Sequence, residues 1–188
     1  MTPDVLEHCT GAPSSRATIF APYLTESMAE FGIDTPARQA AFLAQIGHES
    51  GGLHWTVEIW GPTPQQSKYE PPSNVAAQLG NTQAGDGYRF RGRGLIQTTG
   101  RGNYLRTGQA LGLNLLTTPD QLAEPGLASR SAACFWASHA LNALADVGDF
   151  ERITQRVNGG KTGYSQRLSL WADAKQALGV VEITGAHA

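Results

Sequence analysis

The chain has 188 residues and a formal net charge of −2. This length suits one well-buried domain, and no Pro-, Ser- or Gly-rich linker marks a boundary, so we expect a single domain over residues 1–188 with its core at about 14–179. The slightly negative charge gives no electrostatic reason to expect a nucleic-acid partner or binding to an anionic membrane surface.

The cysteines and the N-terminal segment bear on the compartment. Cys9 and Cys134 have neither a metal-ligand spacing nor a disulfide framework, which is typical of a protein made in a reducing compartment. Residues 1–13 predict a loosely packed lead-in, with early acids and no apolar run of signal-peptide length. We therefore expect synthesis in the cytoplasm without a signal peptide, and no stable membrane insertion because no later segment reaches the length of a span.

The first part of the chain predicts helices. Apolar positions over residues 14–32 recur at about helical spacing, and Pro22 predicts a break or a fresh helix start among them. Thr35 and Pro36 form an N-cap followed by a proline at the first helical position, so a helix is predicted from there to about Glu49. Its apolar residues surround more than one face, which predicts a central, buried helix.

The middle of the chain is less regular. Alternation of apolar and polar residues over 53–60 predicts a short strand, and the prolines and amides of 61–85 predict an irregular, mobile loop. Residues 85–99 thread glycines with arginines and aromatics, which suits a backbone that passes close to another group; their glycine spacing excludes a phosphate-binding loop. A helix over about 102–111 follows.

The last third predicts three more helices. A long, buried helix is predicted over 127–147, and Asp149 is placed to cap the next helix, which should end near Val157. A final helix is predicted over about 162–178, before a fraying tail at 180–188. The overall balance predicts a mainly α fold.

Two carboxylates follow the predicted central helix. Glu49 lies at the C-terminal end of that helix, where the helix dipole disfavours an acid, so a structural reason for it is weak. Glu58 comes nine residues later, after Gly51 and Gly52, which allow the chain to fold back so that the acids face each other across a cleft. Glycoside hydrolysis requires such a pair, one protonated and one ionised. The alternatives are a salt-bridged helix end for Glu49, and a surface acid at Glu58 with Glu70 as its rival.

Other polar and aromatic residues allow two further interpretations. The spacing of His48 and His54 fits no zinc pair and no third ligand is indicated, so neither a metal nor another cofactor is expected. Trp55, Trp60 and Tyr88 could stack on sugar rings, although an aromatic side chain is more often part of a core. Trp60 is included among the expected substrate-binding residues.

Four stretches of the sequence together resemble one family. They are QIGHESGG at 45–52, VE at 57–58, FRGRGLIQTTGRGNY at 90–104 and RVNGGKTGYSQR at 156–167. Their identity, order and spacing resemble glycoside hydrolase family 19, the chitinases and phage-type lysozymes or endolysins, over about residues 35–178. The resemblance implies a lysozyme-like, mainly α domain in two lobes with a substrate cleft between them.

The resemblance also implies roles for individual residues. Glu49 matches the general acid, Glu58 matches the base that activates water, and Thr99 stands where a small hydroxyl residue, usually Ser, helps to hold that water. The remaining matches are sugar-contacting positions or neighbours of the two acids: His48, Gln97, Asn103, Tyr104, Asn158 and Arg167. A charge partner is expected near Glu58 and should be Arg167 or one of the clustered arginines; a structural ion-pair network is the alternative for the cluster Arg89, Arg91 and Arg93.

The predicted function is hydrolysis of β-1,4 links between N-acetylated sugars by a two-carboxylate inverting mechanism. Peptidoglycan glycan strands are the expected partner, because the loops that lengthen the plant chitinase cleft are absent. We expect a monomeric phage or prophage endolysin that is stored in the host cytoplasm, is released by a holin or another route, and acts on the periplasmic cell wall.

Three alternatives stay open. A chitinase would use the same residues. A lytic transglycosylase is also possible, since a Glu followed by Ser and a later Gly-Leu-Ile-Gln resembles that group, which needs one acid and no water. The third alternative is an inactive cell-wall-binding module.

Overall fold

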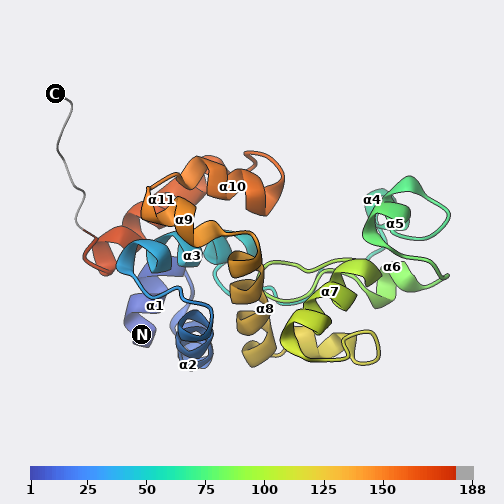
Figure 1. The fold of residues 1–188 in the computed structure, drawn as a ribbon, viewed down its shortest axis with the longest axis horizontal. Coiled ribbons are helices and arrows are strands. Elements are labelled where there is room, and N and C mark those ends of the chain that lie inside the picture. The colour runs from blue at the N-terminus through green and yellow to red at the C-terminus, as the bar shows by residue number, and fades with distance from the viewer. Residues whose placement is uncertain (181–188) are drawn as a thin grey trace.

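The computed structural model describes residues 1–180 and is built from helices (Figure 1). Within these residues, extended pairing is limited to isolated bridges that join Val57 to Arg93 and Arg93 to Thr98. The mainly α fold predicted from the sequence is confirmed. The elements are α1 (Pro3–Thr10), α2 (Ser14–Glu30), α3 (Pro36–Glu49), α4 (Pro64–Ser67), α5 (Asn74–Leu79), α6 (Asp86–Arg89), α7 (Arg101–Leu111), the 3₁₀ helix η1 (Pro119–Ala123), α8 (Pro125–Ser138), α9 (Leu141–Asp146), α10 (Phe150–Asn158) and α11 (Tyr164–Ala177).

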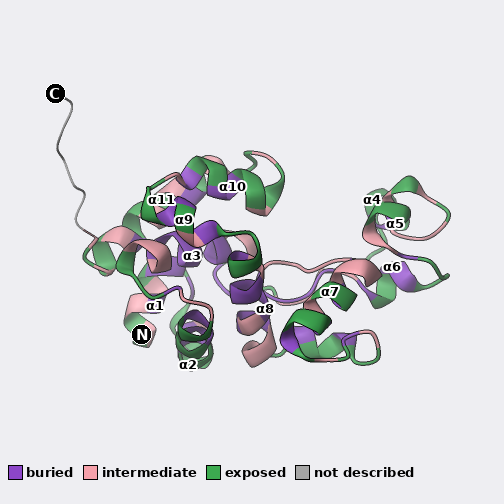
Figure 2. Ribbon diagram, in the orientation of Figure 1, coloured by how far each residue is buried: buried purple, intermediate pink, exposed green. Residues whose placement is uncertain are grey.

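The predicted central helix is α3. The Thr35 hydroxyl accepts a hydrogen bond from the Arg38 N–H, and Pro36 occupies the first turn, so the helix begins where its local signals place it. Every residue from Ala40 to Gly47 is buried, and α1, α9, α10 and α11 pack around the helix (Figure 2). Glu49 therefore stands at the end of a rigid, enclosed element.

Replacing Phe42 or Leu43 by alanine is expected to lower the free energy of unfolding by about 2–5 kcal/mol, because each change removes a fully buried side chain and leaves a cavity. The Phe42 ring also makes an edge contact with Trp136, at 5.4 Å between ring centroids. Denaturant unfolding measures the loss. The control Ile19→Ala, on an exposed part of α2, should change stability by less than about 1 kcal/mol. A loss below about 0.5 kcal/mol at both core positions would contradict the central place of α3.

The helices form two groups of unequal size. The larger surrounds α3 and contains α1, α2 and α8 to α11, while α4 to α7 lie to one side of it (Figure 1). The large group has one extensive apolar core, and a second, smaller cluster contains Phe90, Tyr104, Leu115 and Leu122. This arrangement agrees with the two-lobed fold that the resemblance implied.

Two expectations for the N-terminal part were wrong. The first residues are not a loose lead-in, because α1 carries the fully buried side chains of Leu6 and Cys9. Pro22 does not break α2, which continues from Ser14 to Glu30. The proline removes one backbone donor, but Pro22 and Thr18, whose carbonyl loses that bond, are both exposed, so water can satisfy the carbonyl.

The middle of the chain also differs from prediction. Residues 53–60 do not form a strand, because Val57 alone finds a bridge partner there and an alternating pattern needs a neighbouring strand to persist. Residues 61–85 contain the short helices α4 and α5 rather than only irregular chain. Their signals were present in the sequence: Thr63 and Gln66 form a capping box, and Ser73 caps α5.

The predicted helix over 127–147 is two helices. Ala140 adopts a left-handed conformation, with φ of 51°, and separates α8 from α9. The break turns Leu141 and Leu144 into the core, and Asn142 accepts a hydrogen bond from the Trp136 indole at 2.8 Å. The predictions of α7, α11 and an Asp149-capped α10 are confirmed. Most of the expected tail, residues 181–188, lies outside the described residues.

Candidate active site

Glu49 emerges from the end of α3 beside a buried arginine. Its Oε1 accepts a hydrogen bond from Nη2 of Arg167, which α11 places with only 1% of its surface exposed. Arg167 Nη1 donates to Gln45 Oε1 at 2.5 Å, and the Gln45 amide donates to the Thr154 hydroxyl at 2.8 Å. A network from three helices therefore fixes the direction of the Glu49 carboxylate.

Two expectations about Arg167 need correction. It was expected near Glu58, yet its carboxylate partner is Glu49. Arg167 lies on α11, shortly after the Asn-Gly-Gly turn. Because α11 packs along α3 more extensively than any other element does, the Arg167 side chain lies next to the end of α3. Since Arg167 is almost wholly enclosed, it supports Glu49 from behind and does not offer a surface to substrate. The salt-bridged helix end, considered as an alternative for Glu49, is thus present.

Glu58 is held by two donors that orient both of its oxygens. Its Oε2 accepts the Gly92 backbone N–H at 2.9 Å, and its Oε1 accepts the Gln66 side-chain amide at 2.9 Å. The Glu58 N–H in turn donates to the Gly92 carbonyl at 2.8 Å. Each carboxylate oxygen has a second lone-pair direction, so the fixed carboxylate can still accept a proton from water.

Gly92 lies where the predicted residues converge. A Cβ at this position would stand 2.6 Å from Gln97 Oε1, 3.2 Å from the Thr99 hydroxyl and 3.3 Å from the Glu58 Cβ. Glu58, Gln97 and Thr99 thus surround one glycine, although 41 residues separate Glu58 from Thr99 in the sequence. Because these side chains pack so closely around position 92, only glycine fits there without displacing them.

Gln97 and Thr99 lie on a tight loop that leads into α7, and Asn103 lies in the first turn of that helix. Gln97 has a left-handed conformation, with φ of 53°, and its amide donates to the Gly94 carbonyl at 2.9 Å. The Thr99 hydroxyl donates to the Gln97 carbonyl at 2.9 Å, and the Asn103 amide donates to the Thr99 carbonyl at 2.7 Å. All three side chains line a cavity of about 540 Å³ between this loop, α7 and α8, which is large enough for sugar rings.

His48 precedes Glu49 on α3, and Asn158 is the last residue of α10. The His48 ring packs against Gly163, where any Cβ would overlap it, and its Nδ1 is buried without a hydrogen-bond partner. Burial and the nearby Arg167 charge lower the pKa of His48, which favours the neutral imidazole. Asn158 ends α10 and is exposed. Their predicted substrate contacts stay predictions.

Trp60 and Tyr104 have different surroundings. Trp60 is partly buried between aromatic rings, 5.5 Å from Tyr88 and 6.2 Å from Tyr69 between centroids. Tyr104 is fully buried, and its hydroxyl donates to the Arg91 carbonyl while it accepts from Arg93. Burial raises the pKa of Tyr104 to about 12. The structure therefore gives Tyr104 a supporting position behind the loop, in place of the predicted direct contact with sugar.

Several supporting residues were not predicted from the sequence. Gln66 orients Glu58 from a segment expected to be irregular, and its capping-box spacing with Thr63 was the only local signal for it. Gln45 lies on α3 among the residues predicted to form its apolar faces, so no local sequence pattern indicated its hydrogen bond with Arg167. Glu70, the rival to Glu58, accepts the backbone N–H groups of Gly85 and Tyr88 and so fixes the turn before and within α6.

No group of three or more His, Cys, Asp or Glu side chains among the described residues is arranged to hold a metal ion. In the same part of the chain, no helix combines the length and the apolar character needed to cross a membrane.

Comparisons of sequence add to this geometry. A family model described as chitinase class I matches residues 17–148, which include both candidate carboxylates. A family 19 glycosyl hydrolase domain-containing protein from Haemophilus influenzae is 34% identical over 158 residues, which are 71% of this chain and 76% of that protein. An endochitinase from Arabidopsis thaliana is 38% identical over 148 residues, 75% of this chain but only 48% of the plant protein. Two cotton endochitinases are matched over about a third of their length.

Comparisons of structure agree on the fold. Chitinase C from Streptomyces griseus superposes with a TM-score of 0.72 and 22% identity, covering 98% of this chain and 78% of that one. A bacterial family 19 chitinase gives a TM-score of 0.71 at 22% identity and covers 98% and 97% of the two chains. At this identity the likeness shows the lysozyme-like fold alone.

Proposed function

Because the chain belongs to glycoside hydrolase family 19 and is a glycosidase of the chitinase type, we propose that it hydrolyses the β-1,4 links of bacterial peptidoglycan. The proposal is based on one observation: two carboxylates on separate elements are each held in a defined direction by their own hydrogen bonds. Glu49 is aimed by Arg167 at the end of α3, and Glu58 is aimed by Gly92 and Gln66 on the segment that leaves the large lobe.

The proposed mechanism assigns one step to each carboxyl group. Protonated Glu49 donates its proton to the oxygen of the leaving sugar as the bond to the anomeric carbon breaks. Glu58 removes a proton from a water molecule that attacks the opposite face of that carbon, while the Thr99 hydroxyl, beside Gly92, helps to hold the water. Attack from the opposite face inverts the anomeric configuration, as in other two-carboxylate enzymes without a covalent intermediate.

Charge supports peptidoglycan over chitin as the substrate. Arg89 and Arg91 follow one another within the segment that leads to Gly92, and among the described residues no carboxylate lies within ion-pair distance of either. Chitin is uncharged, whereas peptidoglycan carries carboxylates on its muramic acid and its peptides. Positive charge beside the glycan-binding groups favours the second polymer.

The wild-type protein is expected to degrade purified Gram-negative sacculi at least about tenfold faster, per glycosidic bond, than colloidal chitin, because a tenfold preference needs only about 1.4 kcal/mol of additional transition-state stabilisation. Release of soluble reducing ends measures both rates under one set of conditions. Glu49→Gln, expected to be inactive on both polymers, serves as the control for contaminating enzymes. Equal or faster turnover on chitin would overturn the substrate assignment.

Chitin remains the second candidate because of one specific observation. The bacterial chitinase that superposes on this chain is covered over 97% of its length, so a protein described as a chitinase can consist almost entirely of one such domain. Glu49, Glu58 and Thr99 would cleave either polymer by the same steps. The preference between chitin and peptidoglycan therefore depends on other substrate-binding residues.

The setting we propose is that of a monomeric phage or prophage endolysin, which reaches the periplasmic wall through a holin or another release route. Lysis of outer-membrane-permeabilised Gram-negative cells by added protein would support this role. Peptidoglycan cleavage without lysis of such cells would favour a different setting.

A further inference from the structure

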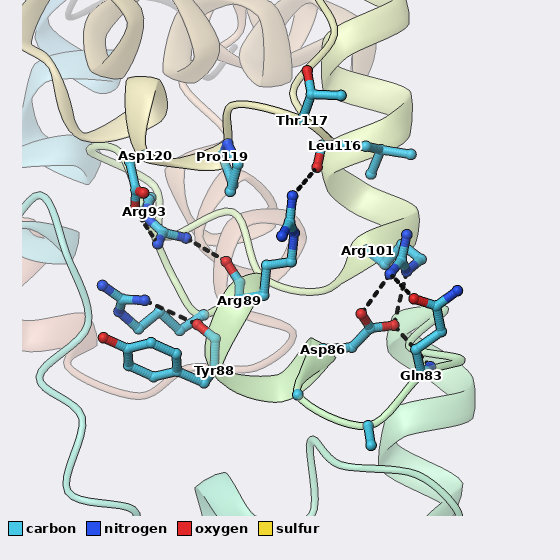
Figure 3. A pocket seen from close by; sticks show the side chains of 13 residues that line it. Gln83, Asp86, Tyr88, Arg89, Arg93, Arg101, Leu116, Thr117, Pro119 and Asp120 are labelled. Carbon is cyan, nitrogen blue, oxygen red and sulfur yellow. Dashed lines mark hydrogen bonds and ion pairs between the residues drawn. The ribbon is translucent and has the colours of Figure 1, made fainter.

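We propose that an arginine-lined cavity, joined to Glu58 through the backbone of Gly92, binds the carboxylates of the peptide stems that peptidoglycan carries. The cavity has a volume of about 740 Å³ and lies between α6, the start of α7 and the loop before η1 (Figure 3). Four arginines line it: Arg89, Arg91, Arg93 and Arg101. This inference rests on the proposed function and names the part of the substrate that this side of the protein would recognise.

Charge within the cavity is unbalanced. Asp86 is paired with Arg101 at 2.6 Å, and Asp120 is paired with Arg93 at 2.5 Å. Although burial opposes it, hydrogen bonds from Arg101 and from two backbone N–H groups lower the pKa of Asp86, which is therefore ionised at neutral pH. The two acids on the wall each neutralise one arginine, and the charges of the other two are left for a ligand.

Arg89 and Arg91 are held in place by uncharged groups. Arg89 Nη2 donates to the Leu116 carbonyl at 2.8 Å. Arg91 Nη1 donates to the Tyr88 carbonyl at 2.9 Å, and its guanidinium lies over the Tyr88 ring at 4.2 Å from the centroid. Backbone carbonyls and a ring fix the direction of a guanidinium without cancelling its charge, and each guanidinium keeps further N–H donors.

Arg93 is a fixed part of the cavity wall. It is 1% exposed, and its Nε is buried without a hydrogen-bond partner in the structure, while its other nitrogens bond to Asp120, Tyr104 and the Arg89 carbonyl. Arg89 and Arg91, which line the same cavity without carboxylate partners among the described residues, therefore leave it suited to an anion.

The cavity is joined to the candidate active site through the backbone. Arg91 and Arg93 flank Gly92, whose N–H donates to Glu58. Tyr88 lines the cavity and contacts Trp60, two residues after Glu58. A peptide extends about 3.3–3.6 Å per residue, so a stem of three residues spans roughly 10 Å from a sugar held near Glu58, and the proposal requires this span to reach Arg91, the neighbour of Gly92. Planar carboxylates are the groups that guanidinium forks bind best.

Calorimetric binding to an inactive Glu49→Gln protein tests the proposal. The probes are a peptidoglycan tetrasaccharide with tripeptide stems, the same glycan after amidase removal of the stems, which leaves the lactyl carboxylates, and chitotetraose. Adding Arg89→Gln or Arg91→Gln should weaken binding of the stem-bearing probe by roughly 5- to 20-fold, the range of a lost charge-assisted contact. The loss for the other two probes should be smaller by at least about threefold.

The matched control is Arg152→Gln, which removes one positive charge from the exposed face of α10 and should leave all three affinities unchanged. Equal losses for stem-bearing and stemless glycan would overturn the stem assignment, as would unchanged affinity for the stem-bearing probe or no binding of it at millimolar concentration. Hydrolysis of sacculi by the wild-type protein is measured in parallel. Cleavage without arginine-dependent binding would retain the proposed function and reject the stem site, whereas arginine-dependent binding without cleavage would do the reverse.

Discussion

Glu49→Gln is expected to abolish glycan hydrolysis, because an amide cannot donate the proton that the leaving oxygen needs. The expected loss of turnover is at least about 10²- to 10⁴-fold, the usual worth of a positioned acid. The amide oxygen can still accept the hydrogen bond from Arg167, so the network behind the side chain is kept. Release of reducing ends from sacculi measures the loss, and binding of a glycan oligomer shows that the cleft is intact.

The control for Glu49→Gln must also remove the negative charge of an acid that pairs with an arginine. Glu30→Gln does so, since Glu30 pairs with Arg130 at 2.7 Å on the surface between α2 and α8. Its activity should equal that of the wild-type protein. A folded Glu49→Gln protein with more than about a tenth of wild-type turnover would remove Glu49 from the role of general acid. Thermal unfolding of each variant separates lost chemistry from lost structure.

Glu58→Gln is expected to reduce turnover by roughly 10²- to 10⁴-fold while binding of glycan is largely retained, because general-base assistance is lost but the side chain keeps its size. The amide can keep only one of the two hydrogen bonds, to Gly92 or to Gln66, since its nitrogen cannot accept either donor. Steady-state kinetics with a soluble oligosaccharide should show the change in kcat with a small change in KM.

Glu70→Gln is the matched control for Glu58→Gln. Both oxygens of the Glu70 carboxylate also accept backbone N–H groups, from Gly85 and Tyr88, so the same change disturbs an equivalent pair of bonds without touching Glu58. We expect turnover within about threefold of wild type, a change of less than about 1 kcal/mol. A large loss for Glu70→Gln, with little effect of Glu58→Gln, would assign the base to Glu70.

Local signals in the sequence account for the elements that were predicted correctly. Thr35 and Pro36 begin α3, and Asp149 caps α10, because each signal acts within its own turn of helix. Where prediction failed, tertiary packing outweighed local preference. Ala140 breaks a continuous helical pattern to turn α9 into the core, and α2 continues through Pro22 because the freed carbonyl is exposed.

Candidate residues of the site could be named from the sequence, but their hydrogen-bond and charge partners could not. Glu49, Glu58 and Thr99 were identified from motifs that stay close in the sequence. Arg167 lies 118 residues from Glu49, and only the packing of α11 on α3 decides which acid it meets. Similarly, Gln66 reaches Glu58 through a turn whose path no residue pattern determines. Periodicity and capping describe single elements, whereas a charge partner depends on how the elements assemble.

The central claim is that two carboxylates act together on one glycosidic bond, and the ends of the products test it most directly. Mass analysis and NMR of products from purified peptidoglycan should find ordinary reducing ends, formed first with inverted anomeric configuration, and their formation should depend on Glu58. The contrary result would be 1,6-anhydro ends from a protein whose turnover is insensitive to Glu58→Gln. That outcome would describe a lytic transglycosylase, which uses one acid and no attacking water.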